Sequence, residues 1–534
     1  MRTLSASDLS LNTATVSKQW SLEECIEGCK RHGIGGIAPW RDKLQDCGVD
    51  RAARLIRDAG LGVSGLCRGG WYTAEGALTQ GVIDDNKRAV DEAAASTEDL
   101  IRLARKMVAD EADAVPRASA SESVGVRLGA LEDVERSESE EIGLRVFVGR
   151  RSASISTSDF APEGLKLLAE RAVEMARLAP EDPYGGLAPA DALFSGDGVD
   201  LDLHDGVDPS PEELREAALA AEDAARGVAG VTNSNGGSAS ASRSVFALAA
   251  TNGFARGYSG GSHTFSASVV AGEGADKQTD YAYRTQRHRS DLPDPAGIGQ
   301  EAGERAVRKV RPVSIPSGKM PVVFDPRVGG GIIGHLLGAM SAPSIARKAS
   351  FLIGREDEQL FDSAIRIAED PQRLRGLRSR NYDGEGVASV PRDLVSNGRI
   401  FGWLTNVASA AQLDLSLTGH ASRGGGGSPG VAAGNIYLAA GEPSVAELIA
   451  DIEDGLFVTD LFGQGVNLVT GDYSRGASGL RIRNGELAEP VAEITIAGTL
   501  PEMFRALVPA SDLELVRGLD VPTFRIDGMF VAGQ

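Results

Sequence analysis

The stretch that decides the fold is SVGVRLGALEDVERSESEEIGLRVFVGRRSASISTSD, residues 123–159. Hydrophobic and polar residues alternate along three segments of it, and Gly129 and Gly149 stand between those segments. Alternation with a period of two is typical of strands whose two faces differ, and glycine at these places favours tight turns. The stretch therefore predicts an antiparallel meander and not a doubly wound parallel sheet.

Two amphipathic helices and a hairpin follow the meander. The segments 161–179 and 210–227 both have proline in the first helical turn, and Ser210 with Glu213 has the spacing of a capping box. The segment 242–274 alternates like a hairpin around Asn252-Gly253. These patterns predict an α+β architecture of antiparallel sheet and long helices, which we divide into domains at residues 96–190 and 191–312.

The remaining residues, 313–534, consist mainly of strand patterns separated by glycine-containing loops. Asn397-Gly398 and Asn484-Gly485 indicate two tight hairpins. We expect a closed or strongly curved antiparallel sheet here, that is, a mainly β, barrel-like C-terminal domain.

Residues 1–95 have a different pattern, in which short strands alternate with helices as in βαβ units. Through GIGGIAPWRDKLQDCGVDRAARLIRDAGL (33–61) and GLCRGGWYT (65–73), this segment resembles the start of a sugar-phosphate isomerase/epimerase barrel of the xylose isomerase-like kind. The pattern ends about three strands in, whereas such a barrel needs eight. We expect a partial, inactive TIM-like segment.

Composition excludes several classes of function. The formal net charge is -20, which argues against a nucleic-acid partner because such proteins gather lysine and arginine on one surface. No segment has the length and apolar character of a membrane span or an export signal, so we expect a cytoplasmic protein. No two of its cysteines have CxxC spacing. Cys25 and Cys29, four apart on an expected helix, are expected to be buried structural thiols and not a metal or redox pair. All four cysteines lie near the N-terminus: Cys25, Cys29, Cys47 and Cys67.

Several motifs, in order along residues 97–534, resemble the TldD/PmbA family. The longest is GQGVNLVTGDYSRGASGLRIRNGELAEPVAEITIAG (463–498), and the others include SIARKASFL (344–352), LTGHASR (417–423) and the terminal AGQ. The resemblance implies a subunit of a heteromeric zinc metallopeptidase that processes unfolded peptides. In that family the TldD type carries HExxxH and a C-terminal cysteine ligand, and the PmbA (TldE) type lacks them.

The segment GHLLGAM (334–340) corresponds to the metal motif. His335 occupies the position of the first histidine, whereas Leu336 replaces the glutamate and Met340 replaces the second histidine. Leucine cannot take a proton from water, and a thioether is a poor zinc ligand. The resemblance thus implies the PmbA (TldE) type, with no catalytic residue, no cofactor bound by this chain and zinc on the partner.

Five residues are candidates for contact with a peptide or a partner subunit: His335, His420, Asp472, Tyr473 and Arg475. We expect backbone groups to satisfy the ring nitrogens of His335. His420 is expected to be exposed, without a carboxylate beside it, and the glycine loop at 422–430 is expected to be mobile. The other histidines stand singly in the sequence and form no ligand spacing.

The leading hypothesis is a non-catalytic subunit, inactive alone, that pairs with a TldD-type metallopeptidase and helps to enclose a peptide-processing chamber. One alternative is a standalone peptide-binding or scaffold protein whose N-terminal segment recruits another partner. A further alternative is sugar isomerase activity of residues 1–95.

Overall fold

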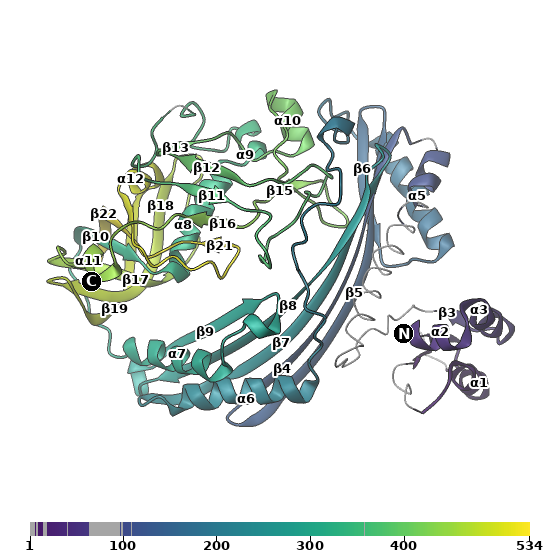
Figure 1. Cartoon of the computed structure of the whole chain (residues 1–534), viewed down its shortest axis with the longest axis horizontal. Helices are drawn as coiled ribbons and strands as arrows, with labels where there is room; N and C mark the ends of the chain where they lie inside the picture. Colours follow the sequence, from purple (N-terminus) through teal and green to yellow (C-terminus); the bar gives the residue numbers. More distant parts are fainter. Residues whose placement is uncertain are drawn as a thin grey trace. The chain divides into compact units, whose positions relative to one another are not determined.

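The computed structural model describes residues 6, 9–13, 19–39, 41–63, 97, 100–107, 109–356 and 358–533. The chain divides into two compact units, Met1–Asp85 and Asn86–Gln534 (Figure 1). Each unit has a hydrophobic core of its own.

The N-terminal unit contains a small parallel sheet of order β1-β2-β3. Ser21 caps the first helix in a capping box with Glu24, and Gly33 ends it in the left-handed conformation. The βαβ prediction is confirmed for this sheet, but a TIM-like barrel is not shown, because the rest of the predicted pattern lies outside the described residues. The elements are β1 (Ser10–Asn12), α1 (Leu22–His32), β2 (Gly36–Ala38), α2 (Arg41–Cys47), α3 (Val49–Asp58) and β3 (Gly62–Val63).

A six-stranded antiparallel sheet of order β6-β5-β4-β7-β8-β9 begins the second unit. Its turns include Gly129 and Gly149, both in the left-handed region, so the predicted meander and hairpin are confirmed. A helical segment, residues 100–106, precedes the sheet. The strands are β4 (Glu111–Arg127), β5 (Ala130–Val148), β6 (Arg151–Thr157), β7 (Val231–Ala250), β8 (Ala255–Ala271) and β9 (Gln278–Gln286).

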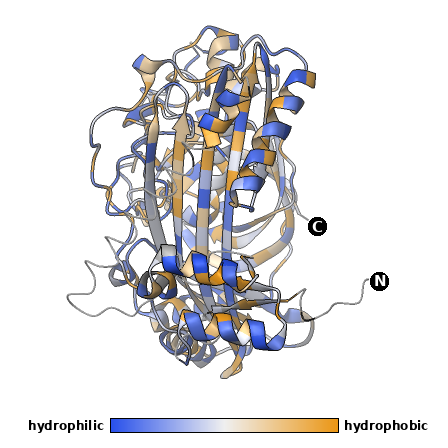
Figure 2. Cartoon of the chain, turned by 90° about the vertical axis from the view of Figure 1, so that its right-hand side faces the viewer, coloured by the Kyte–Doolittle hydropathy of each residue, from blue (hydrophilic) through white to orange (hydrophobic). Residues whose placement is uncertain are grey.

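Helices cover one face of this sheet, as Figure 1 shows for α6 and α7. Ala239 and Phe265 on the sheet pack with Leu214 and Ile298 on these two helices, while α5 packs over β5 and β6. Figure 2 shows hydrophobic and hydrophilic residues alternating along the long strands, which is the pattern of a sheet with two different faces. The helices are α5 (Pro162–Leu178), α6 (Pro211–Gly227) and α7 (Pro295–Arg308), with 3-10 turns at Ala190–Ala192, Gly274–Asp276 and Arg289–Asp291.

Five strands of the C-terminal part close into a barrel, in the order β10-β17-β18-β19-β22, because β22 also pairs with β10. The prediction of a closed sheet is confirmed, although one of its pairings, β10 with β17, is parallel. The short strand β20 (Leu507–Pro509) adds to β22 outside the ring. The barrel strands are β10 (Gly318–Phe324), β17 (Asp454–Phe462), β18 (Asp472–Arg483), β19 (Glu486–Thr499) and β22 (Phe524–Ala532).

A second, five-stranded sheet lies in the same part of the chain, in the order β13-β12-β11-β16-β21. Asn397-Gly398 and Asn484-Gly485 form the two predicted tight turns, each with positive φ at both residues. These strands are β11 (Ile367–Glu369), β12 (Arg392–Ser396), β13 (Arg399–Ile400), β16 (Ile436–Leu438) and β21 (Leu519–Asp520), and a separate pair is β14 (Ala421–Ser422) with β15 (Gly430–Val431). The helices are α8 (Pro326–Ala339), α9 (Ala342–Ala346), α10 (Val407–Leu413), α11 (Val445–Ile449) and α12 (Leu500–Arg505).

In the part of the chain that the structure describes, no helix combines the length and apolar character that crossing a membrane requires.

Candidate functional site

Helix α8, which carries His335, starts directly after barrel strand β10. The Asp325 carboxylate caps it by accepting a hydrogen bond from the Arg327 backbone N–H, at 2.8 Å. At Gly329, an added Cβ would lie only 2.5 Å from the Phe524 ring, so glycine lets the helix approach the barrel wall. The glycine-led start of the segment therefore serves close packing.

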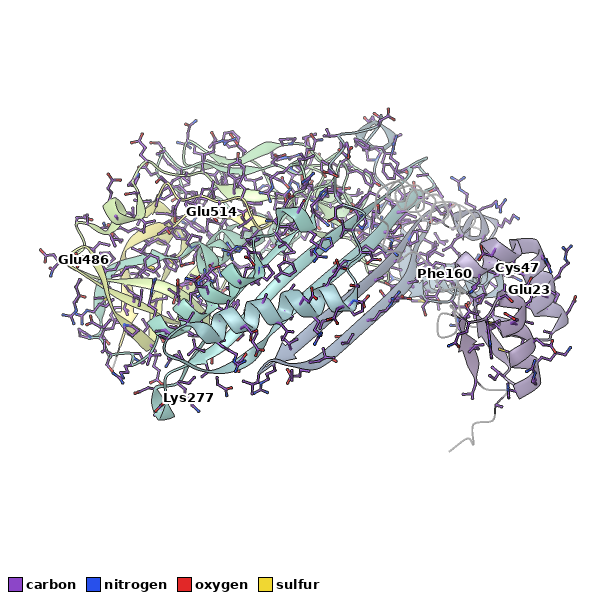
Figure 3. The ribbon with its side chains drawn as sticks, turned by 60° about the horizontal axis from the view of Figure 1, so that its bottom comes forward. Glu23, Cys47, Phe160, Lys277, Glu486 and Glu514 are labelled. Atoms are coloured by element: carbon purple, nitrogen blue, oxygen red, sulfur yellow. The ribbon has the colours of Figure 1, made fainter. Side chains whose placement is uncertain are left out.

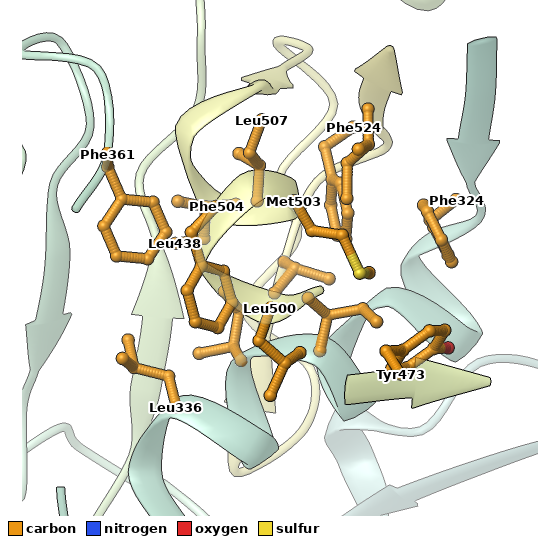
Figure 4. Close-up of a cluster of buried hydrophobic side chains, with 14 of the residues drawn as sticks. Phe324, Leu336, Phe361, Leu438, Tyr473, Leu500, Met503, Phe504, Leu507 and Phe524 are labelled. Carbon is orange, nitrogen blue, oxygen red and sulfur yellow. The ribbon is translucent and has the colours of Figure 1, made fainter. Parts of the chain in front are cut away.

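Leu336 and Met340 point into the main hydrophobic core of the barrel domain. Both have no exposed surface, and they pack in one cluster with Phe504 and Leu500. Figure 4 shows Leu336 among these aromatic and aliphatic side chains. A charged glutamate or a metal-binding imidazole at either place would have to lose its hydration inside this core.

His335 lies beside Tyr473 of β18, with ring centroids 6.1 Å apart in an edge-to-face arrangement. The His335 Nε2 and Tyr473 hydroxyl atoms are both buried, and neither has a hydrogen-bond partner among the described residues. The expectation that backbone groups satisfy His335 is therefore wrong for Nε2. Burial lowers the pKa of His335, and the charge of Arg475 lowers that pKa further, so the ring favours its neutral form.

Asp472 and Arg475 hold the strand that carries Tyr473. The Asp472 carboxylate accepts a hydrogen bond of 2.6 Å from the Thr470 hydroxyl within its own turn, and Arg475 Nε donates to the Phe462 carbonyl at 3.1 Å. Asp472 is exposed and Arg475 is half-buried. The structure thus brings together His335, Tyr473 and Arg475, with Asp472 at the adjacent surface.

His420 is buried, so the prediction of an exposed histidine without a carboxylate is wrong. Only 1% of its surface is exposed, and its Nε2 lies 2.7 Å from Oε2 of Glu369. Burial raises the pKa of Glu369, but the hydrogen bond from His420, the hydrogen bond from the Gly434 backbone N–H and nearby positive charge together outweigh burial and leave that pKa below its ordinary value. The partner is 51 residues away along the chain, on β11, so local sequence could not reveal it.

The glycine loop at 422–430 packs against the large sheet. A Cβ added at Gly143 of β5 would lie 1.7 Å from the Gly425 carbonyl oxygen, and one added at Gly425 would meet the Glu141 carboxylate. The two backbones therefore touch where only glycine fits. This loop makes a close contact between the sheet and the C-terminal part, which the prediction of a mobile loop did not anticipate.

Buried charges reinforce the same contact. Arg145 donates from Nε to the Asp113 carboxylate at 2.9 Å and from Nη2 to Glu385 at 3.3 Å. Arg423, from the glycine loop, completes the cluster with an ion pair of 2.5 Å to Asp113. Each carboxylate has a guanidinium partner, as buried charges require, so the cluster is a structural contact between the sheet and the C-terminal part.

Three histidines that stand singly in the sequence meet around the segment 202–208. His263 Nε2 lies 3.1 Å from the Asp205 carboxylate, and His288 Nε2 lies 3.1 Å from the Asp202 carboxylate. Burial lowers the pKa of nearby His204 to about 4. The sequence contains no spacing signal for this cluster, because the three rings come from a connecting segment, a strand and a loop.

The same segment contains a buried carboxylic acid, Asp208. Both carboxyl oxygens of Asp208 are buried and have no hydrogen-bond partner among the described residues. Burial raises the pKa of Asp208 to about 7. The protonated form of this group is therefore favoured in the folded protein well above its ordinary range.

In the N-terminal unit, Cys25 and Cys29 are fully buried in the core, and burial raises the pKa of both thiols. This matches the prediction of structural thiols. Cys47 lies 3.4 Å from the Glu23 carboxylate, and Figure 3 shows the two side by side. They line a pocket of about 430 Å³, and burial raises the pKa of Cys47 also. Cys67 lies outside the described residues.

Matches to known protein families cover most of the second unit. Models of the PmbA/TldA metallopeptidase match as domain 1 over residues 117–176, as the central domain over 205–310 and as the C-terminal domain over 317–533. The chain belongs to the PmbA/TldD metallopeptidase family. These matches do not support the isomerase interpretation of residues 1–95.

Relatives within the family are similar over most of their length. Metalloprotease PmbA of Escherichia coli O157:H7 is 36% identical over 414 residues, which cover 77% of this chain and 90% of the relative. The Metalloprotease PmbA homolog of Haemophilus influenzae is 35% identical over 439 residues, or 81% and 94% of the two chains. The crystal structure of TldE from Thermococcus kodakarensis has a TM-score of 0.73 at 21% identity, and the match covers 82% of this chain and 99% of that one.

The family implies zinc, so the residues at the motif position must be tested for their fit to this metal. His335 offers one ring nitrogen, but Leu336 and Met340 offer neither a base nor a second good ligand, and both are enclosed in the core. Across the described ranges, no group of three or more His, Cys, Asp or Glu side chains is arranged to hold a metal ion. The residues present therefore do not fit a catalytic zinc site.

Proposed function

We propose that this chain is the PmbA/TldE-type subunit of a two-subunit zinc metallopeptidase. A TldD-type partner would bind zinc and hydrolyse unfolded peptides, and this chain would enclose the peptide without supplying a metal ligand. Membership of the PmbA/TldD metallopeptidase family rests on the domain matches. The assignment to the zinc-less type rests on the helix α8.

The observation that carries the proposal is the burial of Leu336 and Met340. These two side chains occupy the positions of the general base and the second ligand, and both are fully enclosed by the apolar core. Zinc hydrolases need both functions close to an open coordination position. Substitutions at the protein surface would not restore the general base and the second ligand, because helix α8 would have to rotate or the core would have to open.

His335, Tyr473 and Arg475 support a contact role at this place, with Asp472 at its margin. His335 and Tyr473 hold polar atoms without partners among the described residues, and the Arg475 side chain is partly open to solvent. Both atoms are buried, so a peptide or partner group could donate to the neutral imidazole or accept from the phenol only if the adjacent surface, where Asp472 and Arg475 lie, opens on binding. We do not extend this role to His420, because both of its ring nitrogens already have partners, in Thr418 and Glu369.

Co-elution tests the proposal. The full chain is mixed with an HExxxH-bearing family member and passed through size-exclusion chromatography with light scattering. We expect one peak whose mass equals a complex of the two chains. Two separate peaks at micromolar concentration would contradict the proposal and favour a standalone peptide-binding or scaffold protein.

A further inference from the structure

The face of the large sheet that is opposite α6 and α7 is covered with hydroxyl groups. We call it the hydroxyl face. Its side chains are partly or fully exposed, and they come from five neighbouring strands. Its members are Ser137 and Ser139 on β5, Ser119, Ser121 and Ser123 on β4, Ser238, Ser240, Ser242 and Ser244 on β7, Ser262, Thr264, Ser266 and Ser268 on β8, and Thr285 on β9.

These hydroxyls lie in register across the sheet. One row runs through Ser121, Ser242 and Ser262, and the next runs through Ser123, Ser240 and Thr264. Hydroxyl oxygens of cross-strand neighbours are in hydrogen-bond contact at 2.8–2.9 Å. The four pairs are Ser119 with Ser139, Ser238 with Ser266, Ser242 with Ser262, and Thr264 with Thr285.

The hydroxyl face looks toward the C-terminal part of the chain. On the same face of the same strands, Val115 and Leu248 pack with Tyr382 of that part. At the other margin, the Arg327 guanidinium of α8 lies 5.4 Å from the Tyr281 ring centroid, and Tyr281 is directly opposite Ser268. The face is therefore continuous with the helix that carries His335, and Figure 1 shows the sheet curving around this side.

Three physical properties follow from such a surface. Serine adds little apolar area, so covering this face with a folded partner would gain little from the hydrophobic effect. Each hydroxyl can both donate and accept a hydrogen bond, so it can pair with any peptide group. The rows carry no charged side chain from β4 to β8, while on β5 the acidic Glu135 is directly opposite Ser123.

We propose that the hydroxyl face is the surface along which an extended, unfolded peptide is held, by hydrogen bonds between the hydroxyl groups and the peptide backbone. The proposal depends on the proposed function in one respect. The peptide is expected to run toward α8, because α8 corresponds to the helix that carries the metal motif in the family. The hydrogen bonds between the hydroxyl face and the peptide do not depend on hydrolysis. A purely structural role of the serine pairs in strand pairing is the competing explanation.

The test replaces two neighbouring serines by charged residues in the full chain. The variants are Ser121→Asp/Ser240→Asp and Ser121→Lys/Ser240→Lys, and the matched controls are Ser511→Asp and Ser511→Lys on an exposed loop of the C-terminal part. The probes are two fluorescent, unstructured 15-residue peptides, one with four glutamates and one with four lysines. Binding is measured by anisotropy with the chain alone, and hydrolysis is measured with the HExxxH-bearing partner.

The net charge of -20 favours the lysine peptide, and we expect both controls to keep the ratio of the two affinities that the unchanged chain has. The Asp pair should weaken the glutamate peptide and strengthen the lysine peptide by about 3- to 10-fold, with the reverse for the Lys pair, because charges near a protein surface interact at this scale. Circular dichroism and unfolding midpoints verify that the variants fold. If they do not, Ser240→Asp and Ser240→Lys alone replace them.

The outcomes separate the two proposals. Hydrolysis by the complex without any shift in peptide preference would overturn the peptide-holding role and leave the proposed function intact. A shift in binding without hydrolysis would support the peptide-holding role and count against the proposed function. Binding of neither peptide by the unchanged chain, with no shift in hydrolysis between variants, would also overturn the role of the hydroxyl face.

Discussion

His335 and Tyr473 meet edge to face, 6.1 Å between ring centroids, with a buried polar atom on each ring that has no hydrogen-bond partner among the described residues. An unpaired buried hydroxyl costs free energy, whereas its removal with the ring kept in place does not. The replacement Tyr473→Phe is therefore expected to leave the free energy of unfolding unchanged within about 1 kcal/mol or to raise it. Urea denaturation of the purified chain provides the measurement.

A variant that removes the whole ring of Tyr473 is the matched control. Tyr473→Ala is expected to lower the free energy of unfolding by about 3–5 kcal/mol, because it removes a large side chain from the core. A loss of more than about 1.5 kcal/mol for Tyr473→Phe would show that the hydroxyl has a partner within the fold.

Restoring the family's glutamate is expected to damage this chain. Leu336→Glu places a charge in the apolar core, so we expect the free energy of unfolding to fall by about 3 kcal/mol or more at pH 7.5. The neighbouring Leu337 is only partly buried, and Leu337→Glu should cost less than half as much. Denaturation with and without zinc gives the comparison, and equal losses for the two variants would contradict the placement of Leu336.

The pair formed by His420 and Glu369 is expected to behave as one unit. Removing one partner leaves a buried polar group alone, so Glu369→Ala should cost about 3–5 kcal/mol of unfolding free energy. The double variant Glu369→Ala/His420→Ala should cost less than the sum of the single variants, by at least about 1 kcal/mol. A double-mutant cycle by chemical denaturation measures this coupling, and additive losses would show that the 2.7 Å contact carries no stability.

The buried carboxyl group of Asp208 is expected to make the free energy of unfolding depend on pH. Its pKa in the folded chain is raised to about 7 from 3.8, so the folded state keeps a proton that the unfolded state has released. The stability contributed by this group is therefore present below about pH 4 and is lost as the pH rises to about 7. Asp208→Asn imitates the protonated acid and should be more stable than the unchanged chain by about 1–2 kcal/mol at pH 8, but not at pH 4.5.

Unfolding curves at the two pH values measure this difference. Asp197→Asn, on the exposed part of the same connecting segment, is the matched control and should show no pH-dependent gain. An equal difference between Asp208→Asn and the unchanged chain at both pH values would mean that Asp208 is ionised in the fold.

Elements with strong local signals could be predicted from the sequence. The capping box at Ser210, the left-handed glycine at Gly33 and the Asn-Gly hairpins all depend on neighbouring residues, and each forms as expected. The short helix α2 was missed between the expected strand and helix of the N-terminal unit. Closure of the barrel by β10 and β22 joins strands about 200 residues apart, so only a curved or closed sheet could be expected.

The site was less accessible to sequence reasoning, because its contacts are long-range. No sequence pattern near His420 predicts its contact with Glu369. The spacing of His204, His263 and His288 along the chain likewise does not predict that the three rings lie close together. The hydroxyl face does have a signal in the sequence. SASASRS (238–244) and SHTFSAS (262–268) alternate hydroxyl residues with other residues at a period of two, which marks one face of a sheet.

The most direct test of the central claim measures zinc and peptide hydrolysis together. The full chain, its His335→Ala variant and the complex with an HExxxH-bearing family member are each analysed for zinc by mass spectrometry and for cleavage of an unfolded peptide. We predict less than about 0.1 zinc per chain and no cleavage for this chain alone, with zinc and cleavage in the complex that persist when His335 is replaced. One zinc per chain, with cleavage by this chain alone that His335→Ala abolishes, would contradict the account.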